Sequence, residues 1–251
     1  MILTIAYREL RSLFMSPLAW VMLAVVQGIL AYVFLMQVER FLQLQPRLAA
    51  MADAPGLTDI VVAPLLGNAA FILLLIMPLL TMRLISEERR NKTLSLLLSA
   101  PLSMTEIILG KFLAMIIFVA LMVLLLALMP LSLLLGGSID LGMLLSGLLG
   151  LFLLASSFAA LGLYMSCLTA QPTIAAISSF GALLLLWIID WSGSAGAAAD
   201  INIMAYLSMI RHYEPMLHGV FNSSDFIYYL LFIGLFVILS IRRLDAERLP
   251  H

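Results

Sequence analysis

Charged residues are scarce in this sequence of 251 residues, since only 11% of them are Asp, Glu, Lys or Arg. A soluble domain carries about 25% charged residues. The net charge is −1, and no basic stripe is present that could follow a phosphate backbone. Nucleic-acid binding is therefore excluded as a function class. Hydrophobic residues make up 64% of the chain, against roughly 45–50% in soluble domains.

Cysteine and the motifs of common enzymes are also nearly absent. Cys167 is the only cysteine, which excludes an intramolecular disulfide and a cluster of thiolate metal ligands. The chain lacks the Gly-x-x-x-x-Gly-Lys-Ser/Thr phosphate-binding loop and the Gly-x-Ser-x-Gly elbow of hydrolases. His212 and His218 do not have the spacing of a zinc protease. We predict that the chain is no enzyme and binds no cofactor or metal of its own.

Long apolar runs take up most of the sequence. About 20 helical residues cross the roughly 30 Å hydrocarbon core of a bilayer, and several runs reach that length. The predicted spans are 17–36, 64–85, 107–135, 141–167, 173–191 and 226–241. We therefore expect an all-α membrane protein with about six transmembrane helices, formed by one domain over residues 1–251.

The first residues predict a helix that lies along the membrane surface. Apolar residues recur at helical spacing over residues 2–14, opposite Arg8, Glu9 and Arg11. Ser16 and Pro17 are typical of the cap and the first position of a helix, so the first span begins there.

Lysine and arginine predict the orientation. Six spans place both termini on one side, which then holds ten of the 13 Lys and Arg residues. The other side holds only Arg40, Arg47 and Arg211. By the positive-inside rule both termini are cytoplasmic, and residues 37–63 and 192–225 face outward, the first of them as a polar loop.

One cytoplasmic segment is a candidate for receiving force from a partner. Residues 86–98 predict a short helix that Pro101 ends, and Ser103 to Glu106 form a capping box that starts the third span. A partner that pushed on such a helix would move the second and third spans together. The alternative is that its charges only anchor helix ends at the headgroups.

The order of residues in this segment resembles the coupling-helix region of type-2 ABC transporter permeases, the ABC-2 family. The resemblance is carried by an acidic pair, a Thr-Leu run, an Ala-Pro step and a Gly-Lys pair, which are Glu87-Glu88, Thr93-Leu94, Ala100-Pro101 and Gly110-Lys111. Tyr206 to Glu214, Gly219 and Asp225 to Tyr229 are similar to one branch of the family. That branch contains the permeases of gliding motility and of nitrous oxide reductase maturation.

The resemblance implies a permease in a bacterial-type inner membrane, paired with a second permease copy, either identical or related, and bound to two ABC ATPase subunits. ATP and magnesium are then bound by the ATPases, and membrane lipid surrounds the spans. The residues expected to couple to the ATPase are Glu87, Glu88, Arg89, Arg90, Lys92, Thr93, Leu94 and Pro101. Export of a substrate is the expected function. The alternative is a subunit that passes the ATPase stroke to a periplasmic partner while no substrate crosses.

Residues 201–221 predict a hairpin that enters the membrane from outside, as the family resemblance also implies. The stretch is too polar to span lipid and too apolar for a solvated loop, and irregular backbone is tolerated where protein shields it. Pro215 is expected at its bend, with Arg211 and Glu214 paired on one helical turn. The residues expected to form an outer gate or docking face are Arg211, His212, Tyr213, Glu214 and Pro215. Methionines and histidines here would also suit Cu(I), but 16 methionines occur along the chain, so such a cluster arises without a metal.

Overall fold

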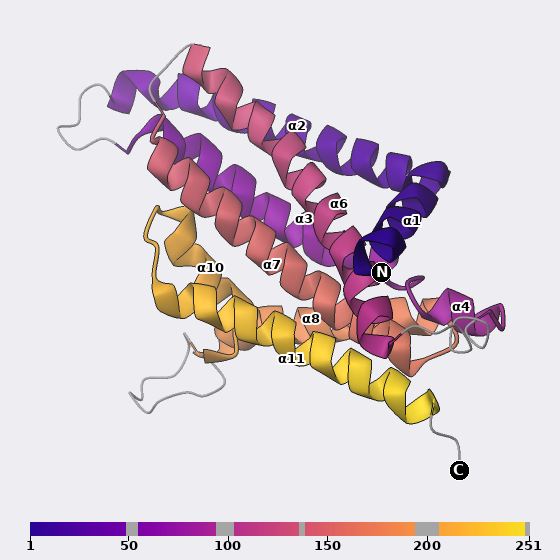
Figure 1. The fold of residues 1–251 in the computed structure, drawn as a ribbon. Coiled ribbons are helices and arrows are strands. Elements are labelled where there is room, and N and C mark those ends of the chain that lie inside the picture. Colours follow the sequence, from indigo (N-terminus) through magenta and orange to yellow (C-terminus); the bar gives the residue numbers. More distant parts are fainter. Residues whose placement is uncertain (49–54, 94–102, 136–138, 194–205, 249–251) are drawn as a thin grey trace.

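The structure is a computed structural model, and it describes residues 1–48, 55–93, 103–135, 139–193 and 206–248. Helices form nearly all of this part of the chain, which contains no strand (Figure 1). The main helices are α1 (Ile2–Met15), α2 (Pro17–Leu48), α3 (Ala63–Thr81), α4 (Ser86–Arg90), α6 (Met104–Ser132), α7 (Leu141–Leu168), α8 (Pro172–Gly193), α10 (Met209–Leu217) and α11 (Ser223–Arg248). A π-helical turn, Thr58–Val62, leads into α3, and a 3₁₀ turn, Leu133–Leu135, follows α6.

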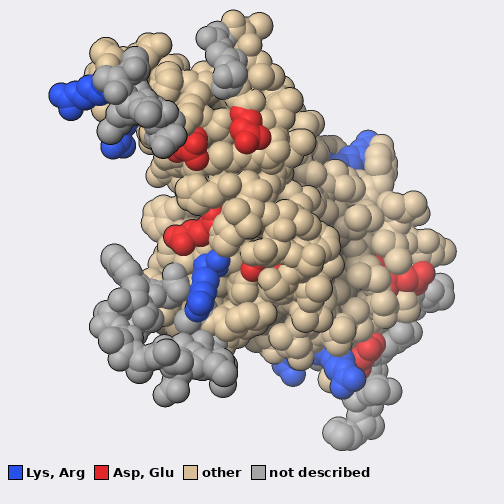
Figure 2. All heavy atoms as spheres, turned by 90° about the vertical axis from the view of Figure 1, so that its left-hand side faces the viewer, with Lys and Arg blue, Asp and Glu red and all other residues tan. Residues whose placement is uncertain are grey.

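Six helices are long and apolar enough to cross a membrane, so the predicted all-α class and number of spans are confirmed. They are Pro17–Arg47, Thr58–Arg90, Met104–Leu135, Leu141–Leu168, Pro172–Ile189 and Ser223–Ala246. Both termini and α4 lie at one end of the helix bundle, and α10 lies at the opposite end (Figure 1). The end that carries α10 shows scattered acidic and basic side chains on a largely uncharged surface (Figure 2).

The first span is longer than the sequence predicted. We expected a polar loop from residue 37, but α2 continues to Leu48 and includes Pro46 in its last turn. Residues 37–45 contain no helix breaker, and Glu39 accepts a hydrogen bond from Gln43 one turn later (3.3 Å). Leaving the hydrocarbon does not end a helix whose residues favour it. At 1.5 Å per residue, α2 is about 48 Å long, well beyond the roughly 30 Å of a bilayer core.

Helix α1 packs across the beginning of α6, where Ile5 and Ala6 are buried, while Leu3 and Tyr7 remain exposed. The chain then turns sharply at Ser16, whose hydroxyl accepts a hydrogen bond from the Leu18 amide (3.3 Å), as its predicted capping role requires. A short helix fixed against protein on one side and open on the other fits the predicted interfacial position.

Helix α7 is the central element of the bundle. It is the most buried span, because 72% of its most apolar 18-residue stretch is buried inside the protein. It packs against α3, α6, α8, α10 and α11. Small residues permit this close packing. A Cβ atom on Gly162 would lie only 2.0 Å from the Thr81 hydroxyl oxygen, so only glycine fits beside α3. Helices α2, α8 and α11 are only 22% buried and present apolar surface outward.

Candidate functional site: an inner ion cluster and an outer hairpin

Helix α4 is attached to the end of α7 through one serine. The Ser166 hydroxyl accepts hydrogen bonds from the Ile85 and Ser86 amides, both at 3.0 Å, and donates to the Met82 carbonyl (3.0 Å). These amides belong to the first turn of α4, where backbone donors have no partner within the helix. Arg89 adds a hydrogen bond to the Cys167 carbonyl (2.8 Å). Hydrogen bonds from Ile85, Ser86 and Arg89 therefore join α4 to the end of α7.

The predicted helix over 86–98 is interrupted near its start, and residues 94–98 lie outside the described residues. Helix α4 ends at Arg90, with Asn91 as its cap, and Lys92 adopts a left-handed conformation (φ 57°). Asn is a common residue at such helix ends, and the reversed backbone at Lys92 stops a continuous helix. The Thr93 amide returns to the Glu88 carbonyl (2.9 Å). Leu94 and Pro101 lie outside the described residues.

A buried lysine joins α4 to two other helices. The Lys111 ammonium group on α6 lies 2.8 Å from a Glu9 carboxylate oxygen on α1 and 2.9 Å from a Glu88 carboxylate oxygen on α4. Arg8 lies 3.0 Å from Glu9 and 3.8 Å from Glu88. We call Arg8, Glu9, Glu88 and Lys111 the inner ion cluster. The Lys111 side chain is only 2% exposed, so its charge depends on these carboxylates.

Electrostatics within the inner ion cluster favour the ionised carboxylate. Burial raises the pKa of Glu9, but the charge of Lys111 and hydrogen bonds from Lys111 and Arg8 outweigh it and lower the pKa below its usual value. Glu9 therefore remains an anion at neutral pH, and the ion pair with Lys111 is maintained.

The structure turns Glu88 inward onto Lys111, although the sequence suggested a place on the surface that meets the ATPase. Glu87 is half-buried and outside the cluster, while Arg90 and Lys92 are exposed. Glu9, Lys111 and Ser166 were not predicted as site residues. One signal was available, because a lysine inside an apolar span needs a buried anionic partner.

Close packing of α1 against α6 explains why a glycine, Gly110, precedes Lys111. A Cβ atom there would lie 2.7 Å from Ile5 Cβ and 3.1 Å from the Ile2 carbonyl oxygen of α1. We expect Gly110→Ala to push α1 away from α6 and to destabilise the protein by about 1–3 kcal/mol through overpacking. Thermal unfolding of the purified protein in detergent measures this loss.

The matched control is Gly28→Ala, since Gly28 lies inside α2 with nothing within 4 Å of an added Cβ. That change should be neutral or stabilising, because alanine is the better helix former by about 1 kcal/mol. Equal stability of the two variants would show that α1 does not depend on close contact at Gly110.

The segment predicted as an outer hairpin, of which the structure describes residues 206–221, contains a short amphipathic helix, α10. Its buried residues are Met209, His212, Tyr213 and Met216, at helical spacing. Arg211 and Glu214 are both exposed and form no ion pair in the described structure, so their predicted pairing is wrong. Exposed charges at this spacing are satisfied by water instead.

The bend of the hairpin lies after α10. Pro215 is inside the helix, and the chain reverses at His218 and Gly219, where Gly219 has φ +78°. The predicted bend at Pro215 is therefore wrong. Glycine takes this left-handed conformation without strain, whereas proline, whose φ is fixed near −65°, cannot.

His212 fixes α10 to the last span. Its Nδ1 atom lies 2.6 Å from an Asp225 carboxylate oxygen in the first turn of α11, and its Nε2 lies 3.0 Å from the Tyr206 carbonyl. A carbonyl only accepts, so Nε2 carries a proton, and a second proton is shared between Nδ1 and Asp225. The ring stacks on Tyr228 at 4.0 Å. We call His212 and Asp225 the outer pair; both side chains are buried.

Tyr213 and Met216 anchor α10 to the core. The Tyr213 hydroxyl donates to the Leu66 carbonyl of α3 (3.1 Å), and burial raises its pKa well above the usual value. Added Cβ atoms on Gly147 and Gly150 of α7 would lie 2.6 Å from Leu66 and 2.9 Å from the Met216 sulfur. These glycines lie about 9–14 Å along α7 from its first residue. Helix α10 therefore lies alongside the first turns of a spanning helix.

Six apolar helices long enough to cross a bilayer define a multi-pass membrane protein. Within the described residues, no three His, Cys, Asp or Glu side chains are grouped as metal ligands. A sequence model described as "ABC-2 family transporter protein" matches residues 3–249. The chain therefore belongs to the ABC-2 transporter family, whose members are membrane subunits of ABC transporters and work with an ABC ATPase. A search among curated proteins finds no match.

Proposed function

We propose that this chain is the permease subunit of an ABC exporter in a bacterial-type inner membrane, with both termini in the cytoplasm. It pairs with a second permease copy and is driven by two ATPase subunits that bind ATP and magnesium. The gliding-motility and nitrous-oxide-reductase-maturation branch is the proposed position within the family. The basic residues at the end that carries the termini support this orientation.

The inner ion cluster is the observation that supports this function best. Helix α4 lies at the end of the second span that is cytoplasmic in this orientation, where an ATPase can reach it. Lys111 and Ser166 join α4 to α1, α6 and α7 at once. A push on α4 is therefore distributed to three packed helices instead of being absorbed by a loose loop.

Glu88→Gln tests this coupling. The amide keeps the size of the side chain but removes its charge, so Lys111 loses one of its two anionic partners and α4 is held less firmly. In proteoliposomes with the co-purified ATPase, we expect the permease-dependent stimulation of ATP hydrolysis to fall about 10-fold, the size of a typical allosteric coupling.

Glu87→Gln is the matched control, because Glu87 is adjacent on the same helix but makes no ion pair in the described structure. It should retain the stimulation. Equal behaviour of both variants, with equal amounts inserted and equal melting temperatures, would leave the charges of α4 as headgroup anchors only.

Mechanical transmission to a periplasmic partner is a second candidate, and α7 favours it. One end of this buried helix holds α4 through Ser166, and the other end holds α10 beside Gly150. The 16 residues between them span about 24 Å of continuous helix. ATP-dependent movement of α10 in proteoliposomes that show no solute flux would favour transmission, and flux with a static α10 would favour export.

A further inference from the structure

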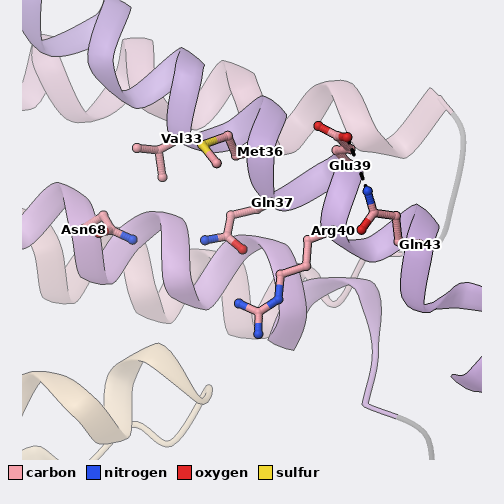
Figure 3. Close-up of a pocket in the computed structure, with 7 residues that line it drawn as sticks. All are labelled: Val33, Met36, Gln37, Glu39, Arg40, Gln43 and Asn68. Atoms are coloured by element: carbon pink, nitrogen blue, oxygen red, sulfur yellow. Dashed lines mark hydrogen bonds between the residues drawn. The ribbon is translucent and has the colours of Figure 1, made fainter.

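A polar pocket lies between α2 and α3, at the end of the bundle opposite the termini (Figure 3). Its volume is about 480 Å³. It is lined by Val33, Met36, Gln37, Glu39, Arg40, Gln43 and Asn68. Neither the inner ion cluster nor the outer pair contributes to it, so the role proposed above for those groups does not account for it.

The pocket changes from apolar to polar along α2. Val33, Gln37 and Arg40 follow one face of the helix at spacings of four and three residues. Gln37 lies 20 positions after Pro17, or about 30 Å along the helix, which equals the thickness of the hydrocarbon core. In the orientation proposed above, with Pro17 at the cytoplasmic boundary of the bilayer, Val33 and Met36 lie at the level of lipid tails and Arg40 lies at the level of headgroups in the outer leaflet; this placement rests on the proposed function.

Two polar groups in the pocket have no protein partner in the described structure. The Gln37 side-chain oxygen is buried and accepts no hydrogen bond. Arg40 makes no ion pair within the described residues, and its neighbour Glu39 accepts a hydrogen bond from Gln43 (3.3 Å). Figure 3 shows the amide of Gln37 and the guanidinium of Arg40 extending from α2 toward α3, away from Glu39. The pocket thus offers a cation beside a buried acceptor.

We propose that this pocket binds the headgroup of a phospholipid-like amphiphile that carries both a phosphate and an O–H or N–H donor. The phosphate pairs with Arg40, the donor bonds to the Gln37 oxygen, and the acyl chains lie along Val33 and Met36. Guanidinium matches phosphate geometry, and a buried acceptor strongly favours a ligand that satisfies it. An arginine that only reached toward the bilayer surface would accept any phospholipid equally.

Native mass spectrometry of the intact protein, released from mixed-lipid nanodiscs, tests the site. The probes are phosphatidylethanolamine and phosphatidylglycerol, which carry a donor, and phosphatidylcholine, which has a phosphate but no donor. We expect the wild type to retain the first two at least about 5-fold more than phosphatidylcholine, consistent with about 1 kcal/mol for one hydrogen bond. Gln37→Leu should abolish this preference, and Arg40→Gln should lose retained lipid of every kind.

Arg47→Gln is the matched control, since Arg47 is an exposed arginine on the same helix outside the pocket. It should retain lipid as the wild type does. Equal retention by Arg40→Gln and Arg47→Gln, no preference over phosphatidylcholine, or displacement of the lipid by an equal concentration of inorganic phosphate would overturn the proposal. The assay measures binding without ATP, so its failure and a failure of the coupling proposal are separate results.

Discussion

Lys111→Met should release α1 and α4 from α6 while keeping nearly the same side-chain volume. The change leaves Glu9 and Glu88 facing each other without the cation that lies 2.8 and 2.9 Å from them. Breaking a buried ion pair from one side costs about 3–5 kcal/mol, and we expect about 3 kcal/mol because both carboxylates keep some contact with solvent. Thermal unfolding in detergent measures the loss.

Arg11→Met is the control, because Arg11 is an exposed cation on α1 with no ion pair in the described structure. Its effect should stay within about 0.5 kcal/mol. A double variant, Glu9→Gln with Lys111→Met, should recover part of the loss since one uncompensated charge is removed. If Lys111→Met is as stable as Arg11→Met, the cluster does not hold the helices together.

The difference in folding stability between the wild type and Lys111→Met should depend on pH in a direction that the pKa of Glu9 determines. The folded-state pKa of Glu9 lies below its usual value, so the ion pair stabilises the protein fully above the usual pKa and loses its effect as pH falls through the lowered one. In Lys111→Met only the largely exposed Arg8 remains beside the two carboxylates, and protonation relieves the repulsion between them. The stability gap between wild type and variant should therefore shrink in acid.

The sequence predicted the spans but could not predict which charges meet. Apolar runs and the cap at Ser103 identify helices because they depend on local residues, and the structure confirms that capping box. Lys111 and Glu9 are separated by 102 positions, and their contact depends on how α1 folds back at Ser16. Local patterns contain no information about that packing, so Glu88 was placed on the surface.

The predictions of a loop from residue 37 and of an Arg211–Glu214 ion pair were wrong for a related reason. The polarity of residues 37–48 predicted a loop, since hydropathy measures preference for lipid, whereas helix formation depends on backbone preference and continues into water. The pairing of Arg211 with Glu214 followed helical spacing alone. The structure shows that His212, between them, makes a buried hydrogen bond to Asp225, which lies 13 positions away across the bend.

His212→Leu should detach α10 from α11, because it leaves Asp225 buried without its partner. One Asp225 oxygen already lacks a hydrogen bond in the described structure, so loss of His212 leaves the whole carboxylate uncompensated. The expected local cost is about 3–5 kcal/mol. Hydrogen–deuterium exchange of the amides over 209–217 should become at least about 100-fold faster, since each 1.4 kcal/mol changes the population of open states about 10-fold.

Three further variants separate the outer pair from general damage to the core. Asp225→Asn should lose less, because the amide N–H can donate to Nδ1 of His212 while Nε2–H still donates to the Tyr206 carbonyl. His212→Leu combined with Asp225→Leu should recover much of the protection, since replacing both members of a buried pair by apolar residues is often neutral. Glu214→Gln alters an exposed charge on the same helix and should leave exchange unchanged. Exchange in the double variant as fast as in His212→Leu would mean that α10 is held by shape alone, through Tyr213 and Met216, and that the charge of Asp225 contributes nothing to the joint.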